Sequence, residues 1–463
     1  MKRYLERSIY SHPVINKIIK KRKNEDVFLV GGSIRDFLIG RRVSDVDIAV
    51  SGSGKLFASK IGRCFKLKEE FDEWRVVLNN YTVDVLGLGD KSIEEDLTRR
   101  DFTINAMAYD LTNGKFYDPL KGVEDIQRKI IRVSREKNIL DDPLRILRGL
   151  RLSVALNFEI ERETKFLFVR YAQNLNSSAP ERIRQELLLM FSEDNSYRGV
   201  LPNVFDIIFP GFIKMEEIGG GRGTNITLLE HSILTVKKLE ELIRNIKPFK
   251  KFENKMRPYL ENKLPLLKIA ALLHDIKKPE TISYDDTGSV HFYGHEEKGA
   301  EWFRKRGKEL KFSKKEIDYI SMIIGNHMWI HLLSTQEILT ERAKRRIIFR
   351  LGEDIMGLIL FSFADAEASN GRTTEKVIYT GNEILKYYFH KKKDIRQIIM
   401  GKDLIKYLGL TPGPYFGEIL KMVQTAYEEG DIRTKKEAVE LAKRIVKERY
   451  KNSNLSNNLR SKS

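Results

Sequence analysis

The sequence predicts an α+β fold, with strands in the amino-terminal part of the chain and helices after it. Apolar and polar residues alternate through residues 45–50 and 81–85, as they do in strands that bury one face. Farther along, Asp142 and Pro143 combine a residue favoured at a helix N-cap with one favoured in the first helical turn. A helix is therefore expected to begin at this point.

Two aspartates at the start of the first of these strands share one face. Asp45 and Asp47 alternate with Val46 and Ile48, and strand side chains change faces at every residue. Mg²⁺ prefers hard oxygen ligands and is usually bound by one or two carboxylates together with substrate phosphates. The pair therefore predicts an Mg²⁺ site that receives a nucleoside triphosphate. Taken alone, an Asp-Val-Asp run is also typical of a solvated strand end.

A glycine pair stands before this strand. Gly31 and Gly32 follow an apolar segment and precede a helix that carries Arg35. Such a turn leaves backbone N–H groups bare near a helix N-terminus, where anions bind. By itself, an ordinary tight turn explains the pair equally well. The strand at residues 81–85 adds Asp84, which is either a third carboxylate or a common strand-end residue.

A further polar group lies in residues 94–108. Arg100, Asp101 and Asn105 would face one way on a helix because residues four apart are neighbours there. Their hydrogen-bonding groups suit ribose hydroxyls and phosphate. The alternative is an ordinary amphipathic helix whose apolar residues belong to the core.

Residues 30–50, 94–108 and 140–151 together resemble the signature of the class II tRNA nucleotidyltransferase and bacterial poly(A) polymerase family. The resemblance implies a mixed-sheet head like that of polymerase beta, followed by an all-helical neck, HD domain and tail. It implies that Asp45 and Asp47 are catalytic Mg²⁺ ligands, with Asp84 as a catalytic carboxylate near the attacking hydroxyl. The nucleotide-binding residues that it implies are Gly31, Gly32, Arg35, Arg100, Asp101, Asn105, Asp142, Arg145 and Arg148.

Within this set, the resemblance gives Asp142 and Arg145 the reading of the Watson–Crick edge of the incoming base. A carboxylate accepts and a guanidinium donates, so the pair could match cytosine or adenine. A helix-capping aspartate with an i, i+3 ion pair is the alternative. Residues 180–187 resemble the neck helix of the family, in which Glu181, Arg182 and Glu186 are expected to stabilise the templating helix.

Histidines are concentrated in the second half of the chain. Six of the eight lie between His231 and His331, and imidazoles with carboxylates at this density predict a metal centre. The pattern resembles the helical HD phosphohydrolase domain. It implies one divalent transition metal such as Mn, Ni, Co or Fe, and a possible second metal. The ligands that it implies are His231, His274, Asp275 and Asp365 for the first metal and His295 and His327 for the second. His291 and His331 match no ligand position and are expected at the surface.

The expected organisation has five parts. They are a catalytic head at residues 1–138, a neck with templating and RNA-binding helices at 139–215, the HD domain at 224–370, a helical tRNA-binding tail at 371–450 and a disordered end at 451–463. The glycine-rich residues 219–223 are expected to mark the junction before the HD domain. Lysines 391, 392, 393, 402 and 406 of the tail either contact phosphate or are ordinary surface lysines.

Composition fits a nucleic-acid partner. A formal charge of +18 over 463 residues favours a polyanion through counterion release, although excess lysine can also serve solvation. The single cysteine, Cys64, excludes an internal disulfide and is consistent with a reducing cytoplasm. No apolar run approaches the roughly 20 residues that span a membrane. A cytoplasmic protein without membrane contact is therefore expected.

The resemblance implies transfer of CMP and/or AMP from CTP or ATP to the 3′ end of tRNA, with release of pyrophosphate and without a nucleic-acid template. The segment at residues 85–93 is shorter than in family members that complete C-C-A, and this shortening is associated with enzymes that stop after C-C. CC-adding, A-adding and poly(A)-forming activities therefore stay open. An HD phosphohydrolase with a docking head and an RNA-binding protein without catalysis are further alternatives, and the complete head motifs argue against both.

Overall fold

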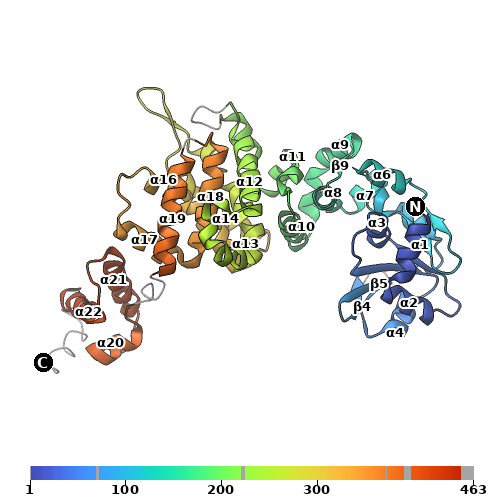
Figure 1. The fold of residues 1–463 in the computed structure, drawn as a ribbon, viewed down its shortest axis with the longest axis horizontal. Coiled ribbons are helices and arrows are strands. Elements are labelled where there is room, and N and C mark those ends of the chain that lie inside the picture. Colours follow the sequence, from blue (N-terminus) through green and yellow to red (C-terminus); the bar gives the residue numbers. More distant parts are fainter. Residues whose placement is uncertain (1, 69–71, 220–224, 372, 391–397, 450–463) are drawn as a thin grey trace. The chain divides into compact units, whose positions relative to one another are not determined.

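The computed structural model describes residues 2–68, 72–219, 225–371, 373–390 and 398–449 (Figure 1). They form two compact units. The first is Met1–Ile213 with Lys308–Phe312, and the second is Lys214–Gly307 with Ser313–Ser463. Three expectations fall outside the described residues: the junction from Gly220 to Gly223, lysines 391–393 and the terminal segment 451–463.

A seven-stranded sheet is the centre of the first unit, with strand order β3-β4-β5-β2-β1-β6-β7. The strands are β1 (Val27–Val30), β2 (Asp45–Val50), β3 (Cys64–Lys68), β4 (Glu73–Leu78), β5 (Tyr81–Gly87), β6 (Ala108–Asp110) and β7 (Phe116–Tyr117). Among the described strands of this sheet, β2 and β5 pair in parallel and the other neighbours are antiparallel. The mixed sheet predicted for the amino-terminal part is confirmed.

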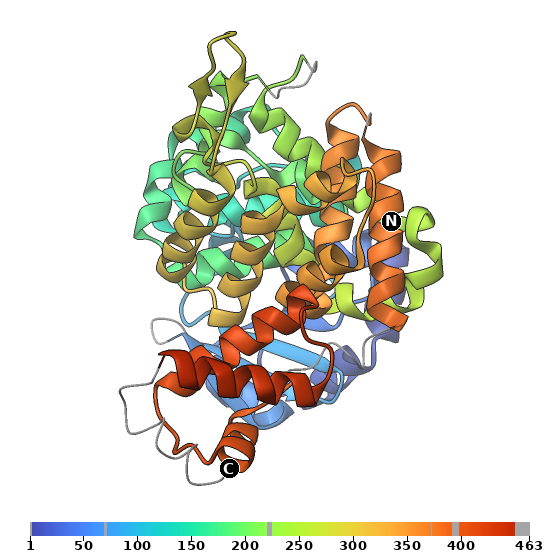
Figure 2. The same ribbon diagram turned by 90° about the vertical axis from the view of Figure 1, so that its left-hand side faces the viewer.

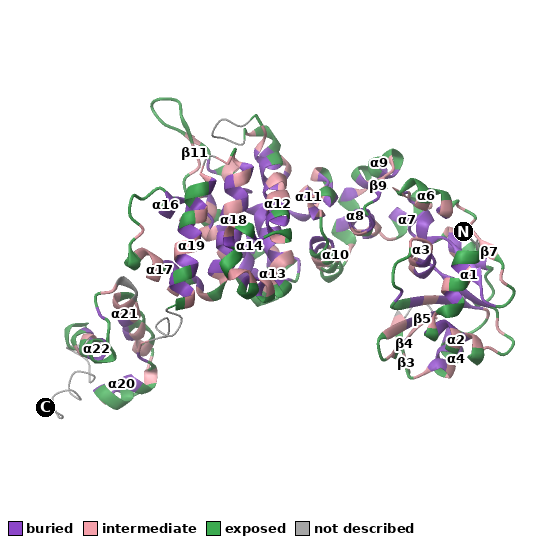
Figure 3. Ribbon diagram, in the orientation of Figure 1, coloured by how far each residue is buried: buried purple, intermediate pink, exposed green. Residues whose placement is uncertain are grey.

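Four helices pack with this sheet because their apolar sides match its buried face. They are α1 (Lys2–Ser11), α2 (Pro13–Lys21), α3 (Gly32–Leu38) and α4 (Gly54–Ile61). Ile9 of α1 and Ile15 of α2 are fully buried in one core with Val46 and Ile48 of β2 (Figure 3). The apolar residues of β2 thus face the helices, as the alternation predicts.

The first unit continues in helices. They are α5 (Ile93–Thr98), α6 (Gly122–Arg128), α7 (Glu136–Asp141), α8 (Arg145–Leu156), α9 (Arg162–Arg170), α10 (Pro180–Ser192) and α11 (Pro202–Ile208). A short parallel pair, β8 (Ile130–Ile131) with β9 (Glu159–Ile160), lies among them. The helix expected near Pro143 begins at Arg145, and Asp142 accepts a hydrogen bond from the Leu144 N–H at 3.3 Å.

The prediction of one helix through Arg100, Asp101 and Asn105 is wrong. Helix α5 ends at Thr98, Phe102 is extended (φ −126°, ψ 151°), and residues 103–105 form a 3₁₀ turn. The buried Asp101 carboxylate accepts from the Phe102 N–H at 2.8 Å and from Asn105 Nδ2 at 2.9 Å. These local bonds compete with helical ones, as is common for aspartate and asparagine.

The second unit is helical, and its helix α18 is buried along almost its whole length (Figure 3). Its helices are α12 (Leu228–Arg244), α13 (Glu253–Leu273), α14 (His295–Glu309), α15 (Lys314–Asn326), α16 (Met328–Ser334), α17 (Glu341–Leu351), α18 (Ile355–Ala368), α19 (Thr374–His390), α20 (Gly401–Leu408), α21 (Tyr415–Glu429) and α22 (Lys435–Arg449). The last three pack on one another around Leu404, Ile419 and Val423 (Figure 2).

One hairpin interrupts the helices of this unit. Strands β10 (Ser283–Tyr284) and β11 (Val290–His291) pair antiparallel, and sequence analysis did not anticipate them. The turn is closed by Asp285, whose carboxylate accepts from the N–H groups of Thr287 and Ser289 at 2.9 Å each. Gly288 supplies the positive φ of 78° that this turn needs.

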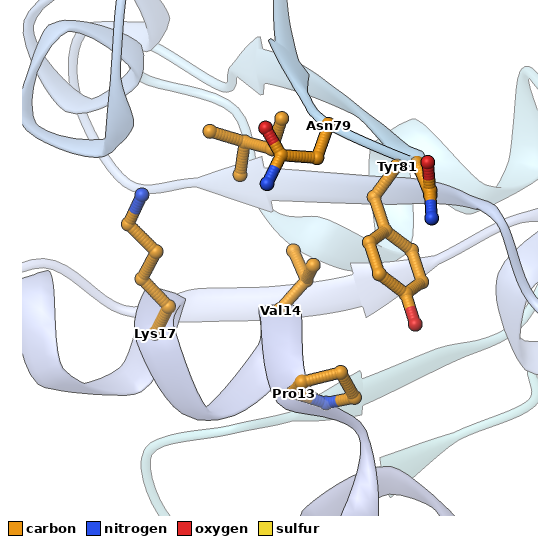
Figure 4. Close-up of a pocket in the computed structure, with 7 residues that line it drawn as sticks. Pro13, Val14, Lys17, Asn79 and Tyr81 are labelled. Carbon is orange, nitrogen blue, oxygen red and sulfur yellow. The ribbon is translucent and has the colours of Figure 1, made fainter.

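A cavity of about 410 Å³ lies between the start of α2 and the turn that joins β4 to β5 (Figure 4). Pro13, Val14 and Lys17 come from the helix, and Asn79 and Tyr81 from the turn and the start of β5. None of the predicted site residues lines it. Separately, no described helix has both the length and the apolar character that a membrane span requires.

A buried ion pair stabilises the second unit, and this leads to the first prediction. Lys268 Nζ of α13 lies 2.8 Å from Glu240 Oε1 of α12, and both side chains are 1% exposed. Lys268→Met leaves the glutamate charge buried, so we expect the free energy of unfolding in urea to fall by about 3–5 kcal/mol. The double variant Lys268→Met/Glu240→Leu should recover most of this loss.

The matched control is Lys443→Gln, because Lys443 pairs with Glu440 at the same 2.8 Å on the surface. Breaking that pair should cost no more than about 1 kcal/mol. Equal losses in the two single variants would show that burial does not set the contribution of the Lys268 pair.

Candidate active site and metal centre

Three carboxylates gather where β2 and β5 run side by side. Asp47 lies opposite Asp84 in the parallel register, and Asp45 lies opposite Thr82 at the start of the strands. Val46 and Ile48 are buried on the other face. The structure thus brings together the three carboxylates that the sequence predicts.

The glycine pair makes room for this group. Gly31 has φ +67° and precedes α3. A Cβ atom at Gly31 would lie 2.7 Å from Arg100 Nη1 and 3.2 Å from Asp47 Oδ2. The turn therefore needs glycine for its conformation and for the close approach of these two charged groups.

Ser33, which sequence analysis did not single out, ties α3 to the strand of the aspartates. Its hydroxyl donates to the Asp45 carbonyl at 3.0 Å and accepts from the Asp47 N–H at 2.8 Å, and the residue is buried. Both bonds are to the strand backbone, so Ser33 fixes the backbone that presents the two carboxylates. In the sequence, the feature that could have pointed to Ser33 is its position directly after the glycine pair.

Arg75 of β4 is a second residue that sequence analysis missed. Its Nε and Nη2 donate to Oδ1 and Oδ2 of Asp84, each at 2.7 Å. The antiparallel register of β4 and β5 places these two residues opposite each other. Sequence alone gave no signal, because the pairing depends on where the turn between the strands falls.

The carboxylate of Asp84 lies close enough to that of Asp47 to influence its ionisation. The pKa of Asp47 is raised to about 6, because burial and, to a smaller extent, the charge of Asp84 raise it more than Arg100 and the other nearby arginines lower it. A buried carboxylate next to another one favours a cation that offsets both. The oxygen donors of Asp45 and Asp47 therefore fit a hard divalent metal ion, with the Asp84 carboxylate beside them.

The predicted nucleotide-binding residues form a connected network beside the carboxylates. Arg35 Nη1 donates to Asn105 Oδ1 at 2.7 Å, and Asp101 Oδ2 lies 2.8 Å from Arg148 Nε of α8. Burial acts to raise the pKa of Asp101, but Arg148, the Asn105 amide and the Phe102 N–H together lower it. Asp101 and Asn105 are buried, whereas the Arg148 side chain is half exposed. The network connects the helix after the glycine pair to α8.

Asp142 and Arg145 lie at the start of α8. Asp142 Oδ2 accepts from Arg182 Nη2 of α10 at 2.9 Å, and Arg151 of α8 pairs with Glu186 of α10 at 2.6 Å. Burial lowers the pKa of Arg145, and its buried Nη1 has no hydrogen-bond partner among the described residues. An unpaired buried donor is costly, so this atom is suited to a ligand.

The second unit contains two groups of metal-ligating side chains. His231, His274 and Asp365 form one, and Asp275, His295 and His327 form the other, with the candidate ligand atoms of each group within 4.8 Å of one another. They come from α12, the end of α13, α18, the start of α14 and the junction of α15 with α16. Asp275 lies between the groups, with Oδ2 3.2 Å from His274 Nε2 and Oδ1 3.5 Å from His295 Nε2.

Backbone carbonyls orient three of these imidazoles. The Nδ1 atoms of His274, His295 and His327 contact the carbonyls of Ala271, Phe292 and Ile324 at 2.9, 2.6 and 2.7 Å. A carbonyl only accepts, so each Nδ1 carries the proton and each Nε2 presents its lone pair. His295 Nε2 and His327 Nε2 lie 3.2 Å apart. Two facing lone pairs at this distance repel unless a cation lies between them, so the group fits a transition metal.

The expectation that His331 is a surface residue is wrong. His331 is 9% exposed, and its Nε2 lies 2.8 Å from Asp365 Oδ2. His331 lies one turn after His327 on α16, so its side chain lies on the same face of the helix and reaches the same centre. In the sequence, this spacing of four residues could have identified it. His291 is half-buried and pairs with Asp285 in the hairpin, outside both groups.

Charges within the centre shift several pKa values. Burial acts against ionisation of Asp365, but its hydrogen bonds with His231 and His331 hold its pKa well below the usual range. Burial also opposes ionisation of Asp275, but its contacts with His274 and with the charged Lys278 hold its pKa well below the usual range. Burial lowers the pKa of His327 far below its usual value. The centre thus combines ionised carboxylates with a neutral imidazole, which are the forms that bind metals.

A cavity of about 950 Å³ opens onto this centre. The ligand side chains line one part of it, and the hairpin contributes Tyr284, Val290 and Tyr293, which are exposed. The space is larger than a phosphate group alone needs.

Comparisons with known proteins agree with this arrangement. The model of the Poly A polymerase head domain matches residues 27–88 and 80–132, and that of the "Probable RNA and SrmB- binding site of polymerase A" matches 157–213. The HD domain model matches residues 228–351, and a model of tRNA nucleotidyltransferase domain 2 matches 300–442. The Thermotoga maritima CCA-adding enzyme complexed with tRNA has a similar fold, with a TM-score of 0.58 and 22% identity over 96% of this chain and 98% of that chain.

Two curated relatives extend over nearly the whole chain. The A-adding tRNA nucleotidyltransferase of Deinococcus radiodurans is 30% identical over 440 residues, which cover 91% of this chain and 95% of the relative. The CC-adding tRNA nucleotidyltransferase of Thermus thermophilus is also 30% identical, over 89% of this chain and 92% of the relative. The chain is therefore an enzyme of the class II tRNA nucleotidyltransferase family.

Proposed function

We propose that this enzyme transfers CMP and/or AMP from CTP or ATP to the 3′-hydroxyl of tRNA. The 3′-oxygen forms a bond to the α-phosphorus of the nucleotide, and the bond from that phosphorus to the pyrophosphate leaving group breaks. The observation that carries the proposal is the parallel register that sets Asp47 opposite Asp84, with Asp45 on the same strand. Membership of the family supports the same reaction.

The carboxylates hold the metal in this proposal. Nucleotidyltransferases of this family use divalent metal ions, and the oxygen donors of Asp45 and Asp47 fit Mg²⁺. When bound, Mg²⁺ supplies positive charge that polarises the reacting phosphate. Asp84 accepts a hydrogen bond from the attacking hydroxyl. The backbone at Gly31 and Gly32 and the guanidinium of Arg100 hold the triphosphate.

Asp142 and Arg145 read the base. The exocyclic amine of cytosine or adenine donates to Asp142, and Arg145 donates to the ring nitrogen next to that amine. The unpaired Nη1 of Arg145 is the available donor, and the Arg182 contact holds the plane of the Asp142 carboxylate. Because the same two groups suit both bases, the pair favours C and A together over U and G.

A primer-extension assay determines which nucleotides the enzyme adds to the 3′ end of tRNA. The A-adding relative of Deinococcus radiodurans and the CC-adding relative of Thermus thermophilus are each 30% identical to this chain, so this identity does not separate the two activities. tRNA ending at the discriminator base, at C or at C-C is supplied with labelled CTP or ATP, and the products are sized. Extension of all three primers indicates complete C-C-A addition, extension only to C-C indicates the CC-adding activity favoured by the short segment after Asp84, and long adenylate tails indicate a poly(A) polymerase.

The second prediction concerns the head carboxylates. Asp45→Ala or Asp47→Ala should abolish nucleotide addition, because each removes a charged oxygen ligand. Affinity for tRNA should stay within a few-fold in filter binding, since phosphate contacts lie elsewhere. Asp90→Ala, an exposed aspartate of the same unit, is the control. Turnover in the Asp45/Asp47 double variant would end this proposal.

The third prediction concerns base choice. Uracil and guanine place a carbonyl where the amine should be, which leaves Asp142 facing an acceptor and costs on the order of 1–3 kcal/mol when desolvated. Asp142→Ala should therefore lose discrimination against UTP and GTP more than it loses turnover with its best substrate, as measured by kcat/KM for the four nucleotides. Wild-type selectivity in this variant would leave Asp142 as a helix cap and a partner of Arg182 only.

We also propose that the second unit hydrolyses a phosphate ester, such as a 2′,3′-cyclic phosphate or a phosphomonoester. The two adjacent ligand groups, with Asp275 Oδ2 3.2 Å from His274 Nε2 and the His295 and His327 Nε2 atoms 3.2 Å apart, favour this second activity. His231, His274, Asp365 and Asp275 would hold one transition metal, and Asp275, His295 and His327 a second. When bound, the metals supply Lewis-acid charge at the phosphate. The cavity of about 950 Å³ leaves room for a group attached to it.

The fourth prediction tests this centre. The purified chain, reconstituted with Mn, Ni, Co or Fe, should retain metal through dialysis in elemental analysis and hydrolyse a 2′,3′-cyclic nucleotide. His295→Ala should lower the metal content and the hydrolysis, while nucleotide addition stays unchanged. His390→Ala is the matched control because His390, exposed at the end of α19, lies outside both ligand groups and does not line the cavity. If the reconstituted wild-type chain holds no metal, the domain has only a structural role.

A further inference from the structure

Arg75 lies at the end of a row of charged side chains that crosses three neighbouring strands. Asp47 of β2 faces Asp84 of β5, and Asp84 faces Arg75 of β4. The guanidinium binds both oxygens of Asp84, at 2.7 Å each, so it fixes the plane of the carboxylate that the proposed reaction sets near the attacking hydroxyl. The sequence motifs of the site do not include Arg75.

The guanidinium keeps donors that this pair does not use. An arginine has five N–H groups, and the contacts with Asp84 occupy one on Nε and one on Nη2. The three others have no hydrogen-bond partner among the described residues. The Arg75 side chain is 40% exposed, whereas that of Asp84 is 18% exposed. With this exposed fraction, the Arg75 side chain is open to a ligand that arrives from solvent.

In the proposed reaction, the RNA primer brings a phosphate group close to the Asp84 carboxylate. In a polynucleotide, the nucleotide that supplies the 3′-hydroxyl carries a phosphodiester on the 5′ side of the same ribose. A hydroxyl at Asp84 therefore brings that phosphate close to a carboxylate, and the two charges repel. A bidentate guanidinium beside the carboxylate is placed to offset this repulsion, because arginine binds carboxylate and phosphate oxygens with the same planar fork.

We infer that Arg75 bridges Asp84 and the terminal phosphodiester of the RNA primer. This role rests on the proposed function of the head, and it makes Arg75 a primer-recognition and positioning residue. Arg75 would bind the RNA primer, and other residues would bind the incoming nucleotide. An ion pair with a purely structural role would affect the stability of the sheet and no kinetic constant specific to the primer.

The fifth prediction follows. Arg75→Gln should raise the KM for the tRNA primer and lower kcat/KM for it by about 10–100-fold, the loss expected when a charge-assisted hydrogen bond to phosphate is removed. The KM for CTP or ATP should change less than about twofold, since uniform binding of the nucleotide is untouched. Arg75→Lys keeps the charge and loses the fork, so its values should lie between those of the wild type and Arg75→Gln.

A binding measurement without metal or nucleotide tests the phosphate contact directly. The affinity for tRNA is measured in EDTA over a series of salt concentrations. Loss of one phosphate contact on a single-stranded end should reduce the slope of log K against log salt by about 0.7. Arg128→Gln is the matched control, because it breaks the exposed Arg128–Glu124 pair of the same unit at 3.2 Å and should leave the slope unchanged.

The outcomes test the role of Arg75 separately from the proposed function of the head. An unchanged salt slope and an unchanged primer KM in Arg75→Gln, with circular dichroism melting like the wild type, overturn the role of Arg75 and leave the head proposal in place. If Arg75→Gln melts early, the same two measurements are made well below its melting temperature, where the variant is folded, and their outcome decides. Nucleotide addition by Asp47→Ala would remove the head proposal, whereas the salt slope would still report whether Arg75 contacts RNA.

Discussion

The candidate active site depends on the parallel pairing of β2 with β5. In a parallel pair the residues at equivalent positions of both strands lie side by side on one face. Here this pairing sets Asp47 beside Asp84 and leaves Val46 and Ile48 to the core with α1 and α2. A shift of one residue would turn the carboxylates of one strand inward, so the buried valines and isoleucines of β2 and β5 hold the register as well as the core.

Neighbouring carboxylates repel each other when both are ionised. Arginine side chains of the head offset this repulsion. The raised pKa of Asp47 reflects burial and the neighbouring Asp84. Arginines from four elements surround the group: Arg35 of α3, Arg75 of β4, Arg100 after α5 and Arg148 of α8. Each is itself tied to an acidic partner, so the guanidiniums are held in place before any ligand arrives. This preorganisation is what electrostatic catalysis of phosphoryl transfer requires.

Sequence reasoning found the parts whose information is local. Strand alternation identified Asp45 and Asp47, the resemblance to the family added Asp84, and the density of histidines identified the second centre. It failed where a tertiary bond overrides local preference, as at Asp101, whose buried contacts with Asn105 and Phe102 end the helical path. It also missed Arg75, whose position opposite Asp84 depends on the register of a hairpin, and His331, which one turn of α16 aims at Asp365. The nucleotide and metal roles of these residues stay predictions.

The two centres use different donor atoms, and this separates their chemistry within one chain. The head presents carboxylate oxygens, which suit Mg²⁺, whereas the second unit adds imidazole nitrogens to the carboxylates of Asp275 and Asp365, a ligand set that suits transition metals. Affinity for transition metals follows the ligand set, so an ion such as Ni²⁺ or Co²⁺ prefers the imidazoles even when Mg²⁺ is in large excess. The two ligand sets therefore favour different metal ions, so no further feature of the chain is needed to direct each ion to its own unit.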